Sequence, residues 1–433
     1  MSSHQDTDTV SRNAAYALLH GALRAQRSVD EDFDKHVSDL APRDRAFVRL
    51  LVATTLRRLG QIDAVLKEFV SRPPPDRVLD LMRLGAAQLL FLETPAYAAV
   101  GIMVALTKRG NEPQAGMVNA VLRRVSEKGA GILAAQNAAK LNTPAWLWSS
   151  WLAAYGEPAT IATAEAHMQE PALDFSLKNP AEAADWAKRL DATPLPTGSL
   201  RRAGGGRIQD LDGFAEGGWW IQDAAAALPA KIVLHALGGG AGKTVIDLCA
   251  APGGKTAQLA AAGCHVTAVD LVADRLSLLR DNLARLGLSA NVATADARTW
   301  QPSELADAVL LDAPCSATGT IRRHPDLPHL KRETDPARLA GLQTQLLEAA
   351  ARMVKPGGHI LYSVCSLQTE ERKGVVSAVL EKDAGLTRIK IPAEAVGGES
   401  QFVTPTGELR TLPSQWPERG GLDGFYGALL QRT

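Results

Sequence analysis

Cysteine is scarce in this chain of 433 residues, which has only four, at positions 249, 264, 315 and 365. No two of them form a Cys-x-x-Cys pair, and none stands at zinc-motif spacing from a histidine. This scarcity excludes a disulfide-stapled scaffold and predicts no metal site. It favours a reducing, cytoplasmic compartment, where a cysteine is either an inert core residue or a reactive thiol.

Long apolar runs are also missing: no stretch of about 18 apolar residues exists, so no membrane span is expected. The polar start, Met1 to Asp8, has no apolar signal core. Lys and Arg number 47, as do Asp and Glu, so the formal net charge is zero. Overall charge therefore neither supports nor excludes a nucleic-acid partner. The length predicts two or three domains, and we expect a monomer.

Three regions differ in their apolar pattern, and we predict one domain from each. Residues 1–140 show helical spacing throughout, which predicts an all-α bundle. Residues 141–235 mix a helix with short strands such as Leu173–Leu177, which predicts a small α+β segment. From residue 236 to 433, strands and helices alternate, which predicts an α/β domain with a parallel sheet.

The strands of the α/β domain are apolar runs that end near turn residues. Helices between them predict a doubly wound sheet covered on both faces, and residues 424–430 predict a final antiparallel strand. The five candidate parallel strands are Val245–Leu248, His265–Val269, Asn291–Ala295, Ala308–Leu311 and His359–Ser363.

A glycine-rich turn, Pro252-Gly253-Gly254, follows the first of these strands and opens a helix. In open α/β sheets ligands bind at the carboxyl ends of the strands, where glycine lets the backbone approach closely. Asp270 ends the second strand, where a ribose-binding carboxylate belongs. Asp296 follows the third strand and could contact an adenine amino group. These residues predict a nucleoside-containing cofactor.

Two other cofactor loops are excluded by spacing. A phosphate-binding P-loop needs glycine five positions before Gly-Lys, where this chain has Cys249 before Gly254-Lys255 and Leu237 before Gly242-Lys243. A dinucleotide dehydrogenase would need Gly-x-Gly-x-x-Gly, which is absent from this loop.

Two cysteines follow strands that should be neighbours in the sheet. Cys315 lies in Asp312-Ala-Pro-Cys315 after the fourth strand, and Cys365 ends the fifth strand. We therefore expect both thiols at one edge of the sheet. A single cysteine is more often an inert core residue, and we interpret Cys249 and Cys264 in this way. The placement of Cys315 and Cys365 instead predicts a thiolate that attacks an electron-poor ring beside a bound methyl donor.

Residues 245–256, 312–319 and 362–371 resemble the motifs of the RsmB/Nop2/Sun family of RNA 5-methylcytosine methyltransferases. The resemblance implies a Rossmann-like domain that uses S-adenosyl-L-methionine. It implies Cys365 as the nucleophile, Cys315 as the acid/base for product release, Asp312 as a holder of the flipped base and Lys255 in the base pocket. The residues implied to surround the cofactor are Cys249, Ala250, Ala251, Pro252, Gly253, Gly254, Lys255, Asp270, Arg275, Asp296 and Asp312. One departure is Val364, where the family usually has threonine; because valine keeps the β-branched shape, we expect activity to survive.

The helical region resembles the NusB-like RNA-binding domain of the bacterial RsmB branch, through Pro42–Phe47, Leu84–Leu90 and Val118–Arg124. The resemblance implies small-subunit (16S) ribosomal RNA as partner and rRNA methylation as function. Arg322, Arg323 and His324 follow the Pro-Cys loop and are expected beside the base pocket. Two alternatives stay open: the same chemistry on tRNA or another RNA, or a non-catalytic RNA-binding or antitermination factor.

Overall fold

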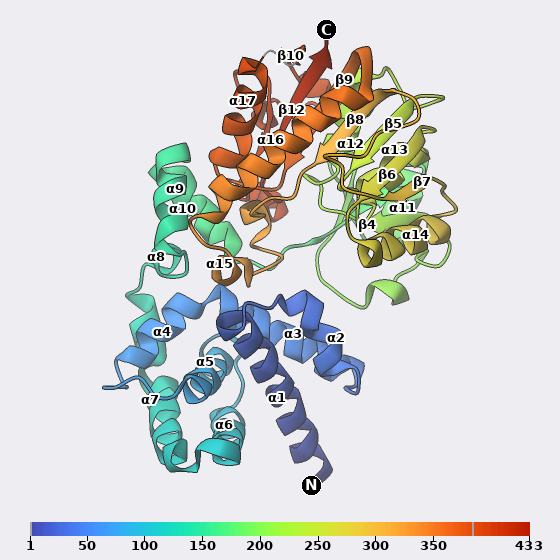
Figure 1. The fold of residues 1–433 in the computed structure, drawn as a ribbon. Helices are drawn as coiled ribbons and strands as arrows, with labels where there is room; N and C mark the ends of the chain where they lie inside the picture. Colours follow the sequence, from blue (N-terminus) through green and yellow to red (C-terminus); the bar gives the residue numbers. More distant parts are fainter. Residues whose placement is uncertain (1, 383–384) are drawn as a thin grey trace. The chain divides into compact units, whose positions relative to one another are not determined.

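The computed structural model describes residues 2–382 and 385–433 and divides into two compact units (Figure 1). The helical unit contains the chain up to Gln169 together with Ile321–Glu333. The α/β unit contains Glu170–Thr320 and Thr334–Thr433. The predicted fold class, a helical domain followed by a Rossmann-like α/β domain, is confirmed. The three predicted domain limits stay a prediction, since the division into units falls at other residues.

The helical unit forms because apolar residues recur at helical spacing and turn residues separate the helices. Pro42 stands at the first turn of α3, where a missing N–H costs no hydrogen bond. Gly85 lets two helices approach closely, because a Cβ there would meet the Leu122 side chain at 2.6 Å. None of the described helices is long and apolar enough to cross a membrane. The helices are α1 (Ser2–Arg24), α2 (Val29–Val37), α3 (Pro42–Arg57), α4 (Leu59–Lys67), α5 (Asp76–Phe91), α6 (Ala96–Asn111), α7 (Ala115–Ala134), α8 (Ala138–Leu141), α9 (Ala145–Tyr155), α10 (Glu157–His167) and, from the later segment, α15 (Leu327–Leu330).

The segment Ile321–Glu333 belongs to the helical unit although it follows the fourth parallel strand in sequence. Arg57 donates a hydrogen bond to the Arg322 carbonyl at 2.8 Å, and the Val29 N–H donates to the Asp326 carboxylate at 2.9 Å. His324 lies 2.9 Å from the Asp30 carboxylate. Because this segment lies between two stretches of the α/β unit, the chain passes from one unit to the other at three places.

A small antiparallel sheet with the strand order β2-β3-β1-β4 begins the α/β unit. A buried ion pair stabilises it, because Arg201 donates two hydrogen bonds to Asp174, at 2.6 and 2.7 Å. Arg201 also donates to the Arg419 carbonyl at 2.8 Å, which ties this sheet to the C-terminal part of the unit. Its elements are β1 (Leu173–Leu177), α11 (Ala183–Arg189), β2 (Thr193–Pro194), β3 (Leu200–Arg202) and β4 (Trp219–Ile221).

The main sheet has the strand order β10-β12-β9-β8-β5-β6-β7, with β11 paired to β12. The five predicted parallel strands are all present, and the predicted C-terminal strand lies antiparallel to β9. Its strands are β5 (Thr244–Leu248), β6 (His265–Asp270), β7 (Asn291–Thr294), β8 (Ala306–Asp312), β9 (Val354–Val364), β10 (Leu386–Ile389), β11 (Leu409–Thr411) and β12 (Phe425–Arg432).

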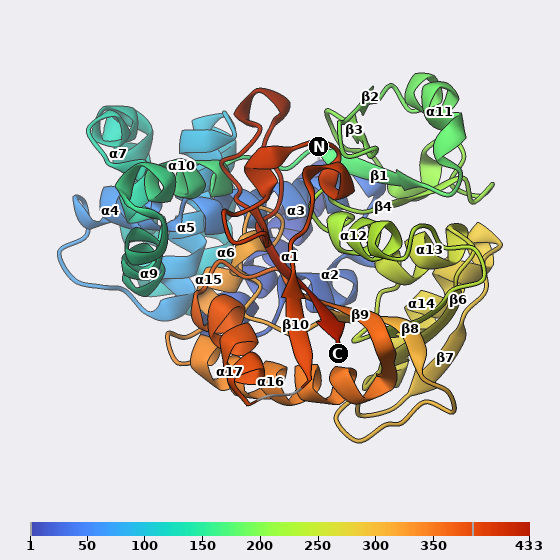
Figure 2. The ribbon, with the colours of Figure 1, turned by 90° about the horizontal axis from the view of Figure 1, so that it is seen from above.

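Helices cover both faces of the main sheet. Ile246 and Leu248 of β5 face one cluster of buried residues, which contains the helix pair α16 (Asp335–Met353) and α17 (Val375–Glu381). Val245 faces the opposite cluster, which contains α12 (Leu228–Ala236) and α13 (Gly254–Ala261). Figure 2 shows α12 and α13 between the main sheet and the small sheet. Helix α14 (Ala273–Leu286) packs on this second side as well.

We expect Arg201→Met to lower the free energy of unfolding by about 3–5 kcal/mol, because it leaves the Asp174 carboxylate buried without its guanidinium. Arg202→Met, at a half-buried neighbour on β3, should change it by less than about 0.5 kcal/mol. Urea denaturation followed by circular dichroism measures both. Equal midpoints for the two variants would contradict a stabilising role of the pair.

Candidate active site

The cofactor loop joins β5 to α13 through residues in the left-handed region of backbone space. Gly253 has φ +101°, and a Cβ there would meet the Leu279 side chain at 2.7 Å. Only glycine fits both conditions without moving α14. Cys249 also has a positive φ, +59°. Burial raises the pKa of its thiol to about 12, so Cys249 is an uncharged thiol in this loop.

Two predicted cofactor residues, Asp270 at the end of β6 and Arg275 in α14, hold the cofactor loop in place. The Asp270 carboxylate is buried and accepts hydrogen bonds from the N–H groups of Ala251 and Val272, each at 3.1 Å. Arg275 donates to the Ala251 carbonyl at 2.7 Å. Asp270 and Arg275 therefore hold the loop at its middle residue. Asp296, after β7, is partly exposed and pairs with Arg298 at 2.6 Å, which lowers its pKa.

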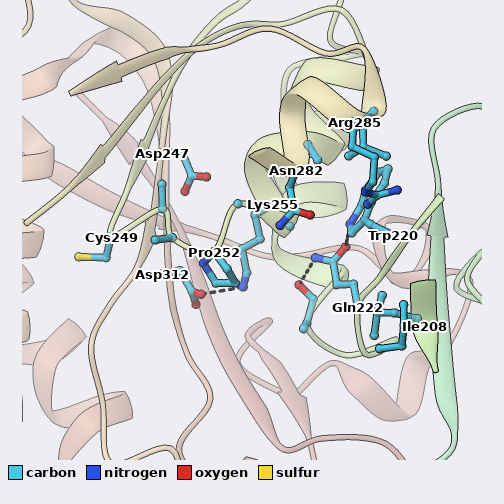
Figure 3. A pocket seen from close by; sticks show the side chains of 18 of the residues that line it. Ile208, Trp220, Gln222, Asp247, Cys249, Pro252, Lys255, Asn282, Arg285 and Asp312 are labelled. Carbon is cyan, nitrogen blue, oxygen red and sulfur yellow. Dashed lines mark hydrogen bonds and ion pairs between the residues drawn. The ribbon is translucent and has the colours of Figure 1, made fainter. Parts of the chain in front are cut away.

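A cavity of about 320 Å³ opens on the cofactor loop (Figure 3). All seven loop residues from Cys249 to Lys255 line it, together with Asp247 and Asp312. Its other wall comes from the small sheet and α14, and Asp270, Arg275 and Asp296 lie outside the lining. The residues of that wall are Ile208, Phe214, Trp220, Ile221, Gln222, Asn282, Arg285 and Leu286.

Lys255 and Asp312 form an ion pair at the end of this cavity, with Nζ and Oδ2 2.7 Å apart (Figure 3). Burial disfavours the ammonium, but the Asp312 carboxylate outweighs it and leaves the pKa of Lys255 raised. Ser363 donates a hydrogen bond to the other Asp312 oxygen at 3.0 Å, and the Lys255 ammonium lies 5.3 Å from the centre of the Phe425 ring. A charged, oriented pair thus stands where the cofactor loop meets β8.

The two predicted catalytic cysteines are in contact. Strands β8 and β9 are parallel neighbours with Asp312 opposite Ser363, so the loops after them leave the sheet at the same level. The Sγ atoms of Cys315 and Cys365 are 3.4 Å apart, and both are free thiols. The hydrogen bond with Cys365, burial and nearby negative charge raise the pKa of Cys315 well above its ordinary value. Cys315 therefore holds its proton at neutral pH.

Two glycines allow the Pro-Cys loop to approach the Cys365 loop. The Gly319 N–H donates to the Cys365 carbonyl at 2.9 Å, and the Gly424 N–H donates to the Gly319 carbonyl at 2.8 Å. A Cβ on Gly319 would lie 2.0 Å from the Gly424 oxygen. Backbone hydrogen bonds of Gly319 and of Gly424, the residue before β12, therefore hold the two cysteine loops together.

The sequence did not reveal two buried carboxylates of this site. Asp247 of β5 accepts a hydrogen bond from Thr256 at 2.6 Å, and burial raises its pKa to about 7. Within the described ranges its other oxygen has no hydrogen-bond partner. Glu371 is fully buried beneath the cysteines, although it stands in a charged run that is typical of an exposed helix.

The segment after the Pro-Cys loop belongs to the helical unit. The expectation that Arg322, Arg323 and His324 lie beside the base pocket stays a prediction. The Arg322 side chain is buried, which leaves no exposed guanidinium for a phosphate. Its burial results from contacts with helices far away in sequence, which local patterns do not indicate.

The doubly wound sheet, the glycine-containing loop after β5 and the carboxylates after the next strands define a Rossmann-like methyltransferase that uses S-adenosyl-L-methionine. The loop residues fit this cofactor, since seven of them line one cavity and Gly253 leaves no room for a side chain. No cluster of three or more His, Cys, Asp or Glu side chains among the described residues is arranged to hold a metal ion.

Comparison with known proteins identifies the family. Residues 235–431 match the family described as 16S rRNA methyltransferase RsmB/F, and residues 9–127 match the NusB family. The ribosomal RNA small subunit methyltransferase B of Xanthomonas campestris is 33% identical over 98% of this chain and 97% of its own length. The Vibrio cholerae protein of the same name is 32% identical over 97% of each chain. The crystal structure of PH0851 superposes with a TM-score of 0.78 at 25% identity, covering 98% of this chain and 99% of its own.

The chain belongs to the RsmB/F family and is an S-adenosyl-L-methionine-dependent RNA methyltransferase. The resemblance drawn from the three catalytic motifs and the NusB-like region is therefore confirmed. The same result disfavours the alternative of a non-catalytic RNA-binding factor.

We expect Gly253→Ala to raise the dissociation constant for S-adenosylmethionine about tenfold, because alanine disfavours the left-handed backbone by about 1–2 kcal/mol and would push against Leu279. Gly263→Ala is a matched control: it has φ +87°, but its Cβ would have ordinary contacts and it lies outside the loop. Isothermal titration calorimetry gives both constants. Equal affinities for the two variants would show that the conformation of Gly253 does not matter for binding.

Proposed function

We propose that this enzyme transfers a methyl group to carbon 5 of a cytosine in RNA, through a covalent bond between Cys365 and the base. The observation that carries the proposal is the contact between two thiols from adjacent strands, next to the Lys255–Asp312 pair. Carbon 5 of cytosine is a weak nucleophile, and a thiolate that adds to carbon 6 activates it.

S-adenosylmethionine supplies an electrophilic methyl group when it is bound. The loop from Cys249 to Lys255 would hold it, with the loop fixed by Asp270 and Arg275. Asp296 stands after β7 and is partly exposed, and its carboxylate, which pairs with Arg298, would also accept a hydrogen bond from a polar group of the adenosine.

Charge distinguishes the two cysteines and supports the assignment of their roles. The Lys255 ammonium interacts electrostatically with Cys365. Cys315 instead faces the carboxylate of Glu371, which favours its neutral thiol. Cys365 is therefore better suited to attack, and Cys315 to act as an acid.

The thiolate of Cys365 adds to carbon 6, and the electron pair of the carbon 5–carbon 6 double bond moves to carbon 5. Carbon 5 would then take the methyl group from the sulfonium, whose sulfur–methyl bond breaks and leaves its electron pair on the sulfur, so that S-adenosylhomocysteine is the leaving group. Asp312 would accept a hydrogen bond from the exocyclic amine, while Lys255 and Ser363 keep its carboxylate oriented. Carbon 5 then loses its proton to water, the double bond re-forms, and the electron pair of the carbon–sulfur bond returns to Cys365. The Cys315 thiol, 3.4 Å away, stabilises the departing sulfur with a hydrogen bond.

The proposed substrate is small-subunit ribosomal RNA. Two relatives named for that activity match this chain over nearly their full length. The NusB-like helical unit provides a second region with an RNA-binding relationship, and Arg123 and Arg124 of α7 are exposed there. A cytosine must leave its stack to reach a pocket formed by strand ends, so we expect a single-stranded or loop site.

We expect Cys365→Ala to lower methylation by more than about a thousandfold, the scale on which the loss of a covalent nucleophile acts, while the affinity for S-adenosylmethionine stays unchanged. Labelled S-adenosylmethionine and total RNA from a strain that lacks this gene provide the assay, with calorimetry for the cofactor. Turnover like that of the unmodified enzyme would rule out Cys365 as the nucleophile. Label in small-subunit RNA would support the proposed substrate, and label only in small RNAs would assign the same chemistry to another RNA.

We expect Cys315→Ala to accumulate a covalent enzyme–RNA adduct, because attack by Cys365 proceeds but the departing sulfur loses its hydrogen-bond donor. Denaturing gels of the same incubations separate the adduct from free protein, and Cys264→Ala serves as the control because it changes a buried cysteine elsewhere in the α/β unit, just before β6. Free release of methylated RNA by Cys315→Ala would mean that the roles of the two cysteines are misassigned.

A further inference from the structure

Glu371 lies directly beneath the two cysteines and touches the loop of each. It belongs to the helical turn Glu370–Gly374, six residues after Cys365, and its side chain is fully buried. The Ser316 N–H donates to Oε1 of Glu371 at 2.7 Å. The hydroxyl groups of Ser316 and Ser366 both donate to Oε2. Each serine directly follows one of the cysteines, so this single carboxylate bridges the two loops.

The hydrogen-bond pattern explains why a carboxylate stands here. Gln343 of α16 adds a fourth donor, with its Nε2 3.1 Å from Oε1 of Glu371. Each oxygen therefore accepts two hydrogen bonds, which is the full capacity of a carboxylate. Gln343 also donates to the Pro314 carbonyl at 2.9 Å, so it holds the residue before Cys315 as well. An amide oxygen at position 371 could accept only two of the four bonds.

The charge of Glu371 acts on the Cys315 thiol. It contributes to the raised pKa of Cys315, after the hydrogen bond with Cys365 and burial. The other titratable groups next to Cys315 are Cys365, whose Sγ is 3.4 Å away, and Tyr362, whose own pKa is raised by burial. On the other side Lys255 faces Cys365. The site is therefore polarised, with an anion beside the thiol and a cation beside the nucleophile.

We propose that Glu371 is a positioning residue that holds Ser316 and Ser366, and through them the thiols of Cys315 and Cys365, at contact distance. This inference rests on the proposed function for the roles of the two cysteines. The carboxylate acts through the serines and does not touch the base or the cofactor. Its charge also keeps the proton on Cys315 until the sulfur of Cys365 departs.

The test compares Glu371→Gln with Glu408→Gln. Glutamine keeps the size of the side chain but removes the charge. Its amide nitrogen can take the place of Oε2 if the hydroxyls of Ser316 and Ser366 accept hydrogen bonds from it and no longer donate them. Glu408 is another fully buried carboxylate, whose partners are Tyr426, Arg388 and Thr406 and not the cysteine loops. Glu408→Gln therefore controls for the loss of a buried carboxylate in general.

The first readout needs no RNA: alkylation of Cys315 by iodoacetamide as a function of pH, measured by peptide mass spectrometry. Removal of a neighbouring negative charge lowers a thiol pKa, so the alkylation midpoint should move down by about one pH unit in Glu371→Gln. Glu408→Gln should keep the midpoint of the unmodified enzyme. An unchanged midpoint in Glu371→Gln, or the same shift in both variants, would overturn the proposal.

The second readout is turnover. Glu371→Gln should lower kcat by about a hundredfold, the upper range for the loss of a well-placed catalytic geometry, with an unchanged KM for S-adenosylmethionine. The double variant Ser316→Ala/Ser366→Ala removes the two hydroxyl bridges without burying a new group, and it should lower kcat in the same direction. This variant decides the matter if Glu371→Gln does not fold. If the unmodified enzyme forms no 5-methylcytosine, the proposed function is refuted. The alkylation midpoints still decide the role of Glu371 in that case.

Discussion

The parallel pairing of β8 with β9 is the constraint on which the rest of the site depends. Asp312 lies opposite Ser363 in this pair, so both cysteine loops begin at one level of the sheet edge. A slip of one residue would turn every side chain of a strand to the other face. The Asp312 carboxylate would then leave the Lys255 ammonium, and the two thiols would no longer meet. The helices on both faces keep this register because they bury alternate residues of the strands.

The position of Val364 in this register explains why valine can stand where the family usually has threonine. Its side chain is fully buried in the cluster that contains α16 and α17, and its backbone pairs with Tyr426 of β12. An apolar β-branched residue suits that environment, and no polar partner is lost there. The groups that orient Asp312 are instead Lys255 and Ser363, which are both present.

Much of the α/β unit could be predicted because short stretches of sequence indicate its strands, helices and turns. Apolar runs that end in Asp270, Asp296 and Asp312 mark both the strands and the edge where ligands bind. The placement of Cys315 and Cys365 at one edge of the sheet followed from the usual order of strands in such a sheet. These inferences needed no knowledge of distant packing.

The remaining features are non-local. Glu371 gains its role from groups on three separate segments, and its neighbours in sequence are those of a solvated charged turn. The location of Arg322 depends on contacts such as its hydrogen bond with Arg57, which is more than 260 residues away in the chain. Periodicity and motif spacing describe an element and its ends, whereas these contacts depend on how distant elements pack.

The inclusion of Ile321–Glu333 in the helical unit has a consequence for how this protein can be divided. A polypeptide that stops at Gln169 would contain ten of the helices but would lack α15, and it would leave the Val29 N–H and the Arg57 guanidinium without Asp326 and the Arg322 carbonyl. The complementary fragment would carry that segment without the helices to which Arg322 and Asp326 are hydrogen-bonded. The two units are therefore interlaced along the chain, and no single cut separates them into two intact modules.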